Sequence, residues 1–171
     1  KMKSFALGVG LVSFLFAVQS EGTCDTYWTE YNGKCYRYFG EPYVNWVDAE
    51  NNCIGVDSHL AAIHSAEDQE FIVTFWRTSR GAIKTDDYPW KPDVAIVYIG
   101  LRDVNGDGDY AWSDGTALDY TNWSTDQPSG GSENSVIIWD WPKKEGKWND
   151  ITSKTKVIIG PYICQKANTE C

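Results

Sequence analysis

Residues 98–123 read YIGLRDVNGDGDYAWSDGTALDYTNW, and this stretch decides the fold. It opens within an apolar run, 95–101, which is typical of a buried β-strand. Residues 102–135 then carry many Gly, Asp, Asn and Ser residues, with almost no regular pattern. An unpatterned stretch longer than about 15 residues is usually functional or disordered in a compact domain. Aromatic residues such as Trp112 and Trp123 favour an ordered loop that packs on the core.

The flanking sequence predicts a hairpin and two helices. Asn32-Gly33 lies between apolar runs, which predicts a β-hairpin within residues 24–43. Apolar spacing predicts one helix over 44–54 and a second that begins after a Ser65 cap, with Asp68 as the capping-box acid. The remaining expectations are strands over 136–139 and 157–164 and a polar loop over 77–93.

Length and composition limit the possible functions. The chain has 171 residues, enough for one domain with a core. Aromatic residues make up 15% of the chain, and this content excludes a globally disordered protein. The formal net charge of −9 disfavours binding to nucleic acid and favours cations such as calcium.

The first twenty residues are typical of a secretory signal peptide. Lys1 and Lys3 precede an apolar run over 5–18, and cleavage is expected after Ser20. A membrane anchor is the alternative, but the run is shorter than the roughly 20 residues that cross a bilayer. We therefore expect a secreted, extracellular protein with a signal peptide over 1–20 and one mature domain over 21–171.

Five cysteines stand in the chain, and an oxidising compartment would pair them. They are Cys24, Cys35, Cys53, Cys164 and Cys171. An odd number cannot pair completely within one chain, and any four allow three connectivities. The residues alone leave the pairing open, although Cys24 and Cys35 flank the predicted hairpin turn and could link its strands.

Several motifs in one order resemble C-type lectin-like domains. The residues that match are Tyr98-Ile99-Gly100-Leu101, Trp112-Ser113-Asp114-Gly115-Thr116, Tyr120-Thr121-Asn122-Trp123, Trp148-Asn149-Asp150 and Tyr162-Ile163-Cys164, with the hairpin residues from Cys24 to Tyr36 and His59-Leu60-Ala61 upstream. The resemblance covers nearly all of 24–164, which we take as the domain core, with 165–171 as a C-terminal tail.

The resemblance implies a fold class and a disulfide pattern. The fold is α+β: a C-type lectin fold, with two helices flanking small antiparallel sheets and a long calcium-binding loop region. The implied disulfides are Cys53–Cys164 and Cys24–Cys35. A third family disulfide is absent, because Ser135 and Ser153 occupy its positions. Cys171 is then left over, and it is a candidate for an interchain disulfide in a homodimer.

The resemblance also implies a principal calcium site that would bind sugar hydroxyls directly. Its ligands would be Gln127, Ser129, Glu133, Asn149 and Asp150, and the Gln127-Pro128 bond would be cis. Gln127 matches the galactose-type triplet of the family. Ser129 departs from the pattern, because its hydroxyl is shorter than the usual amide or carboxylate and carries no charge. The alternative is that these polar residues only satisfy the loop backbone.

An auxiliary, weaker calcium site is implied by Asp103 and Asp107, with Glu133 and Asn134 as further ligands. The run from Asp103 to Asp114 also resembles an EF-hand loop, but an EF-hand needs a helix on each side and a strand-like run precedes this one. A solvated acidic turn is the third interpretation.

The leading hypothesis is a secreted, calcium-dependent lectin that prefers galactose-type glycans as partners, with Ca²⁺ as its cofactor. The alternative is a sugar-independent domain of the same fold that binds a protein or mineral surface. Neither His59 nor His64 lies in a recognisable catalytic context, so we expect no enzymatic activity.

Overall fold

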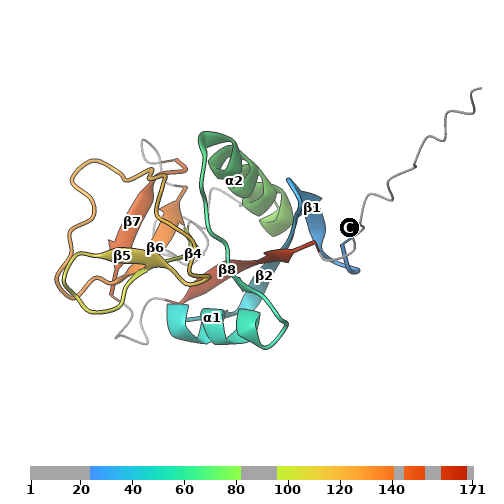
Figure 1. Ribbon diagram of the computed structural model, residues 1–171, viewed down its shortest axis with the longest axis horizontal. Coiled ribbons are helices and arrows are strands. Elements are labelled where there is room, and N and C mark those ends of the chain that lie inside the picture. Colours follow the sequence, from blue (N-terminus) through green and yellow to red (C-terminus); the bar gives the residue numbers. More distant parts are fainter. Residues whose placement is uncertain (1–23, 82–95, 141–144, 153–158, 169–171) are drawn as a thin grey trace, which may run out of the picture.

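The computed structural model describes residues 24–81, 96–140, 145–152 and 159–168. Within them lie ten elements in chain order, drawn in Figure 1. They are β1 (Thr29–Tyr31), β2 (Lys34–Val44), α1 (Trp46–Ile54), β3 (His59–Leu60), α2 (Ala66–Arg80), β4 (Ile96–Asp103), β5 (Tyr110–Trp112), β6 (Ser135–Trp139), β7 (Trp148–Ile151) and β8 (Gly160–Ala167). The predicted signal peptide, most of the 77–93 loop, Ser153 and Cys171 lie outside the described residues.

The predicted hairpin is present. Asn32 and Gly33 have φ angles of 48° and 74°, which suit an Asn-Gly turn. The turn joins β1 to β2 as antiparallel neighbours, with Thr29 opposite Tyr36. The Cys24–Cys35 disulfide links the segment before β1 to β2, as the resemblance implied.

Strand β8 is the centre of the sheet. The strand order is β1-β2-β8-β4-β6-β7, while β3 pairs with β8 and β5 with β4. The small antiparallel sheets are thus joined into one mixed sheet, through a parallel contact between Tyr98 of β4 and Tyr162 of β8. The strand expected over 157–164 lies at 160–167, and residues 157 and 158 are outside the described part.

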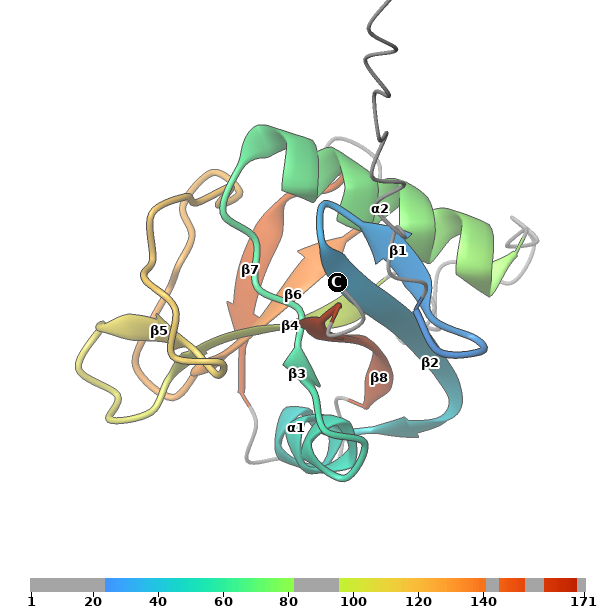
Figure 2. The same cartoon turned by 45° about the vertical axis from the view of Figure 1, so that its right-hand side comes forward.

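The two helices lie on opposite sides of the strands β2 and β8, as Figure 2 shows. Asn45 caps α1, and its side chain accepts a hydrogen bond from the Asp48 amide. Ser65 caps α2 as predicted, since its hydroxyl accepts from the Asp68 amide at 3.0 Å. The Cys53–Cys164 disulfide joins α1 to β8 and spans 111 residues of sequence.

Helix α2 is longer than the sequence predicted. The polar loop was expected from residue 77, but the helix continues to Arg80 and ends at Gly81, whose φ is +74°. Arg77 and Arg80 both pair with the carboxylate of Asp140, which follows β6. Although burial raises the pKa of Asp140, hydrogen bonds and ion pairs with the two arginines lower it overall. These pairs, remote in sequence, stabilise the last turn of the helix.

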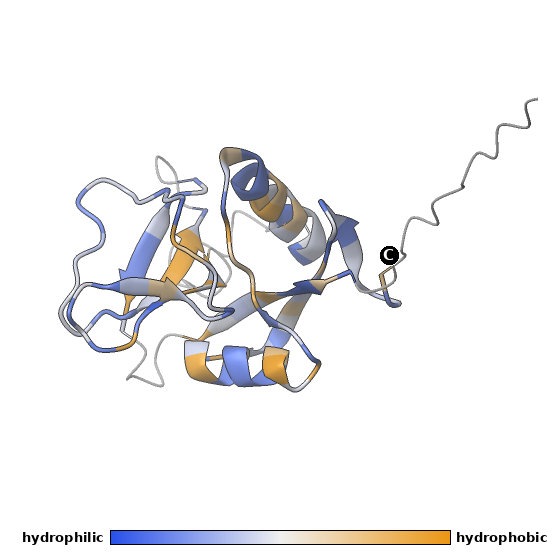
Figure 3. Ribbon diagram, viewed as in Figure 1, coloured by the Kyte–Doolittle hydropathy of each residue, from blue (hydrophilic) through white to orange (hydrophobic). Residues whose placement is uncertain are grey.

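The core is apolar on both sides of the sheet. The middle of strand β6 is hydrophobic in Figure 3, and Val136, Ile137 and Ile138 are almost fully buried. One cluster of buried residues packs α2 against β4, β6 and Trp148, and the other packs α1 against β4 and β8. None of the described helices is both long and apolar enough to cross a membrane.

Candidate functional site

The long loop between β5 and β6 is held by aromatic packing. Trp148 of β7 is fully buried, and the rings of Trp112, Tyr120 and Trp123 meet it edge-on at 5.7, 5.8 and 5.7 Å between centroids. Its indole N–H donates to Gln69 Oε1 of α2 at 2.7 Å. The prediction of an ordered, packed loop is therefore confirmed for these segments.

Four of the five predicted principal ligands are joined by hydrogen bonds. The hydroxyl of Ser129 donates to Glu133 Oε2 at 2.6 Å. The amide of Ser129 donates to Asp150 Oδ1 at 2.8 Å and to Gln127 Oε1 at 3.1 Å. The Gln127-Pro128 bond is cis, as the resemblance implied. The structure thus brings Gln127, Ser129, Glu133 and Asp150 together in one cluster.

Asn149 lies next to this cluster on β7 and is almost fully buried. Its Nδ2 donates to the carbonyl oxygen of Asp150 at 2.8 Å. Its main chain pairs with Ile137 of β6, so the strand fixes the position of the residue. The side-chain amide nitrogen is therefore engaged by the chain itself.

Asp150 is the residue that holds the loop in place. Its carboxylate is completely buried and accepts from the Ser129 amide, from the Gly130 amide at 2.6 Å and from the Tyr110 hydroxyl at 2.9 Å. A carboxylate has about four lone-pair positions, so these three donors leave about one. The Tyr110 pKa is raised, by burial and then by its hydrogen bond to Asp150.

Sequence reasoning missed Tyr110 and the Gly130 amide. Tyr110 packs edge-on against Trp123 at 5.1 Å, which places its hydroxyl beside Asp150. An aromatic residue two positions before Trp112 suggests packing, but nothing in the local sequence identifies the carboxylate, 40 residues away, that its hydroxyl contacts.

The cluster has the donor chemistry of a calcium site. Its side-chain ligand atoms are all oxygens, from two carboxylates, two amides and one hydroxyl, and hard cations bind such atoms. No lysine or arginine in the described ranges forms an ion pair with Glu133 or Asp150. Within those same ranges, no group of three or more Asp, Glu, His or Cys side chains is arranged so that it could hold a metal ion. By residue type alone, two carboxylates with neutral oxygens beside them are the groups that would hold a cation here.

The auxiliary residues are arranged differently. Asp103 is fully buried at the end of β4, and its carboxylate accepts from the amides of Gly106, Asp107 and Gly108 at 2.7, 3.3 and 2.9 Å. Burial raises the pKa of Asp103, but these backbone N–H groups outweigh it and lower the pKa overall. The Asp103 carboxylate therefore stabilises its own turn.

Two of the other auxiliary residues have hydrogen bonds of their own. Asp107 Oδ1 accepts from the Asp109 amide, and the carbonyl oxygen of Asn134 accepts from the Asp103 amide. Strands β4 and β5 flank the turn, so an EF-hand is excluded here. Among the three interpretations, the hydrogen bonds favour a structural acidic turn.

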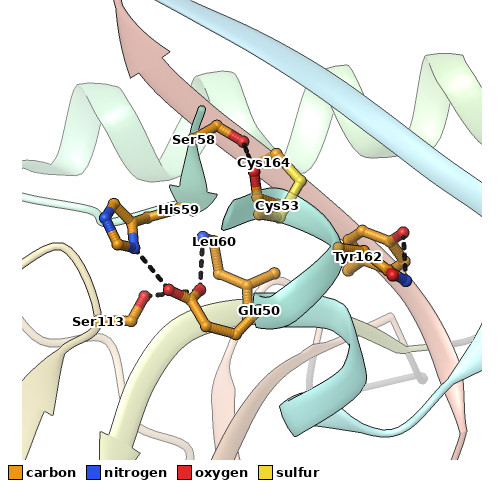
Figure 4. The surroundings of a disulfide bond; sticks show 9 residues. Glu50, Cys53, Ser58, His59, Leu60, Ser113, Tyr162 and Cys164 are labelled. Carbon is orange, nitrogen blue, oxygen red and sulfur yellow. Dashed lines mark hydrogen bonds and ion pairs between the residues drawn. A yellow bond between two sulfur atoms is a disulfide. The ribbon is translucent and has the colours of Figure 1, made fainter. Parts of the chain in front are cut away.

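The two histidines have structural contacts. Figure 4 shows the buried Glu50 carboxylate between His59 and Ser113, close to the Cys53–Cys164 disulfide. It accepts from the Leu60 amide and the Ser113 hydroxyl, each at 2.9 Å, and contacts His59 Nδ1 at 2.5 Å. His64 contacts Asp119 at 2.8 Å. These contacts join α1, β3 and the segment after β5.

Comparison with known proteins agrees with this fold. Residues 43–166 match the family described as Lectin C-type domain. The alpha-N-acetylgalactosamine-specific lectin of Patiria pectinifera is 32% identical over 148 residues, which is 83% of this chain and 79% of that protein. The low affinity immunoglobulin epsilon Fc receptor of Homo sapiens is 30% identical over 147 residues, which is 86% of this chain but 39% of the receptor.

Solved structures agree as well. The cow C-type carbohydrate-recognition domain of CD23, in the presence of a GlcNAc2Man3 oligosaccharide, has a TM-score of 0.64 and 29% identity, over 85% of this chain and 97% of that chain. A calcium-independent type II antifreeze protein has a TM-score of 0.66 and 27% identity, over 85% and 95%. The fold is thus that of a C-type lectin-like domain.

The chain belongs to the Lectin C-type domain family. The relatives named above are lectins, receptors and binding proteins rather than enzymes, which confirms the prediction of a non-enzymatic domain.

Proposed function

We propose that this protein is a secreted, calcium-dependent lectin that prefers galactose-type sugars. The observation that carries the proposal is the cluster in which Ser129 donates its hydroxyl to Glu133 and its amide to Asp150, since two carboxylates lie there without a described cationic partner. Gln127 and the relative named as an alpha-N-acetylgalactosamine-specific lectin support the galactose-type preference.

Each residue of the cluster has a distinct role in this proposal. Gln127, Ser129, Glu133, Asn149 and Asp150 would hold the ion, which when bound supplies coordination to two neighbouring sugar hydroxyls. Glu133 and Gln127 accept hydrogen bonds from those hydroxyls. Asp150 keeps the Ser129 and Gly130 backbone in place through its two amide contacts. Asn149 is positioned by the pairing of β7 with β6.

Affinity resins test the proposal. The secreted protein should be retained on galactose and N-acetylgalactosamine resins more than on mannose resin, and a chelator should release it. Ser129→Asp should strengthen retention, because it adds an anionic oxygen beside the ion. Glu133→Gln should abolish it. Asp126→Asn is the matched control, since this exposed residue precedes Gln127 and has no hydrogen bond to the cluster among those described. Retention that survives both the chelator and Glu133→Gln would refute the proposed site.

A sugar-independent role is the second candidate, and one observation favours it. Three protein donors already occupy Asp150, so the loop is held without an ion, and one structural relative is described as calcium-independent. Such a domain would present its loop to a protein or mineral surface. Thermal melts separate the two. A site with a dissociation constant of about 0.1–1 mM stabilises the fold by about 1.4 kcal/mol at ten-fold excess of calcium. Identical melts with calcium and chelator would favour the second candidate.

We also propose that Cys171 links two chains, because it is left over once the other four cysteines are paired. Two linked sites raise avidity for multivalent glycans by about 10²–10⁴ when both can engage. Non-reducing electrophoresis should give a dimer for the wild type and a monomer for Cys171→Ser. A monomeric wild-type band would contradict the interchain bond.

The proposed cleavage after Ser20 is tested by the N-terminal mass of the secreted protein.

A further inference from the structure

One arginine and three aromatic rings form a group on the face of β2 and β8 that packs against α1. The guanidinium carbon of Arg37 lies over the ring of Phe39, 4.7 Å from its centroid, and over the ring of Tyr27, 5.7 Å from its centroid. Phe39 stacks in turn on Tyr162 of β8, with centroids 4.9 Å apart and planes 6° from parallel. Ring faces attract a cation, so these contacts hold the guanidinium in place.

Arg37 has no counter-ion within the described residues. No carboxylate there forms an ion pair with it, and no oxygen there accepts a hydrogen bond from it. Its nitrogen atoms are not among the buried, unpaired atoms of that part of the chain, so they are accessible to solvent and to a ligand. Lys166, on the same face of the sheet, differs because it is paired with Asp25. Arg37 is therefore an accessible positive charge in a chain whose formal net charge is −9.

Tyr27 is held over this charge in an unusual conformation. Its φ is +72°, in the left-handed region that residues with a Cβ rarely adopt. It is 81% exposed, the highest value among the large hydrophobic residues described. The turn that carries it is closed by a hydrogen bond from the Trp28 amide to the Asp25 carbonyl oxygen at 2.9 Å. A strained backbone that places a ring in solvent is more typical of a binding surface than of a core.

This arrangement has the chemistry of an anion site. A guanidinium carries five N–H donors in one plane, and two of them can pair with the two oxygens of one carboxylate. The rings of Tyr27 and Phe39 present their faces to Arg37, so they leave this fork of donors available. The stacking also orients the guanidinium before a ligand arrives, which lowers the entropy cost of binding.

The net charge restricts the ligand further. A chain with a formal net charge of −9 repels a polyanion, so a ligand with a single anionic group suits Arg37 better. The exposed ring of Tyr27 adds an apolar surface on which a sugar ring can pack. We propose that Arg37 and Tyr27 form a calcium-independent site for a sugar that carries one oxyanion, a carboxylate or a sulfate ester. The choice of a sugar rests on the carbohydrate binding proposed above, whereas the oxyanion follows from Arg37.

An NMR titration of the ¹⁵N-labelled full chain in the presence of a chelator tests the site. Glucuronate and galactose 6-sulfate are the probes, and they distinguish the two oxyanions. Galactose is the neutral control, and acetate is the control without a sugar ring. We expect at least one probe to shift the Arg37 side-chain Nε–H and the amides of Tyr27 and Phe39, with saturation in about the millimolar range. Galactose and acetate should bind at least about ten-fold more weakly.

Three outcomes of this titration would overturn the proposal. Galactose that binds as tightly as the probes would exclude recognition of an oxyanion. Acetate that binds as tightly would exclude recognition of the sugar. Absent shifts, or shifts spread over all lysine and arginine side chains, would exclude a site at Arg37.

Substitutions of Arg37 separate its planar fork from its charge. Arg37→Gln removes both and should weaken binding at least about ten-fold. Arg37→Lys keeps the charge without the fork, so most of the binding should again be lost. Lys34→Gln is the matched control, because it removes one positive charge from the same strand but, by strand alternation, on the opposite face, where Tyr36 packs against Phe71 of α2. Wild-type binding by either Arg37 variant, or an equal loss in Lys34→Gln, would overturn the site.

Tyr27→Gly distinguishes a binding role of the ring from a structural one. Glycine adopts a φ of +72° without strain, so the urea midpoint of unfolding should stay close to that of the wild type. Binding of the anionic sugar should weaken about five-fold, because the stacking surface is lost. A lower midpoint with unchanged binding would overturn the role of Tyr27.

Glu133→Gln separates this site from the proposed principal function. It should abolish chelator-sensitive retention on resin and leave the shifts caused by the anionic sugar unchanged. Loss of those shifts in Glu133→Gln would overturn the separate site, whereas the shifts without any calcium-dependent retention would refute only the proposed principal function.

Discussion

Removing the Tyr110 hydroxyl should loosen the loop in a measurable way. The hydroxyl donates to Asp150 Oδ2 at 2.9 Å, and its contact with the Glu133 carbonyl, at 3.5 Å, is weak. Tyr110→Phe deletes this donor but keeps the ring packed against Trp123. The substitution therefore tests one hydrogen bond to a buried carboxylate with little change in packing.

The magnitude follows from the charge of the acceptor. A hydrogen bond to a charged group contributes about 1.5–3 kcal/mol, and Tyr110 is only half-buried, so we expect a loss of about 1.5 kcal/mol. Asp150→Asn should cost more, about 3 kcal/mol, because its amide nitrogen would face backbone N–H donors. The double variant should lose less than the sum, since both changes remove the same contact.

Urea unfolding in the presence of a chelator is the assay. Tyr120→Phe is the matched control: its ring also packs on Trp148, no hydrogen bond of its hydroxyl is described, and its effect should stay within about 0.5 kcal/mol. The reasoning is refuted if Tyr110→Phe is as stable as the wild type, or if the effects of Tyr110→Phe and Asp150→Asn add fully.

Three further outcomes are expected in the same assay. Gly100→Ala should destabilise the protein by about 1–3 kcal/mol, because the new Cβ would lie 2.7 Å from the Leu60 carbonyl oxygen. The control Gly55→Ala, at a position with a helical conformation and ordinary contacts, should be close to neutral. Equal effects of the two substitutions would contradict this reasoning. Cys53→Ser should cost about 4–5 kcal/mol, since that disulfide closes a loop of 111 residues, and a loss below about 1 kcal/mol would argue against the chain-entropy estimate. Burial raises the pKa of Tyr38 from 10.0 to about 12. The contribution of the neutral Tyr38 side chain to the free energy of unfolding is therefore complete below pH 10 and is lost as the pH rises to 12. A free energy of unfolding that stays constant over that range would contradict this prediction.

Local signals in the sequence were sufficient to predict features that are stabilised by residues close to one another in the chain. The Asn32-Gly33 turn and the Ser65 cap are examples, because each is completed within a few residues. The disulfide pairs and the cis Gln127-Pro128 bond came from the resemblance to a family, and the structure contains them.

Features that depend on contacts between segments far apart in the sequence could not be predicted in this way. Strand β7 has four consecutive buried residues and no alternation, and it is a strand because it pairs with β6, where Ser135 faces Ile151. The end of α2 depends on Asp140, 60 residues beyond Arg80. The donors to Asp150 are largely backbone amides, which every residue type carries, so no residue pattern could identify them.

The packing around Trp148 has an optical consequence. Three aromatic rings, from β5 and the long loop, each lie within 6 Å of the Trp148 ring of β7 in edge-on geometry. Such a rigid chiral arrangement gives near-ultraviolet circular dichroism, a signal that disappears when side-chain packing is lost even if helices and strands remain. The loop that carries the proposed calcium cluster is thus attached to the chromophores that would report its ordering, without any added label.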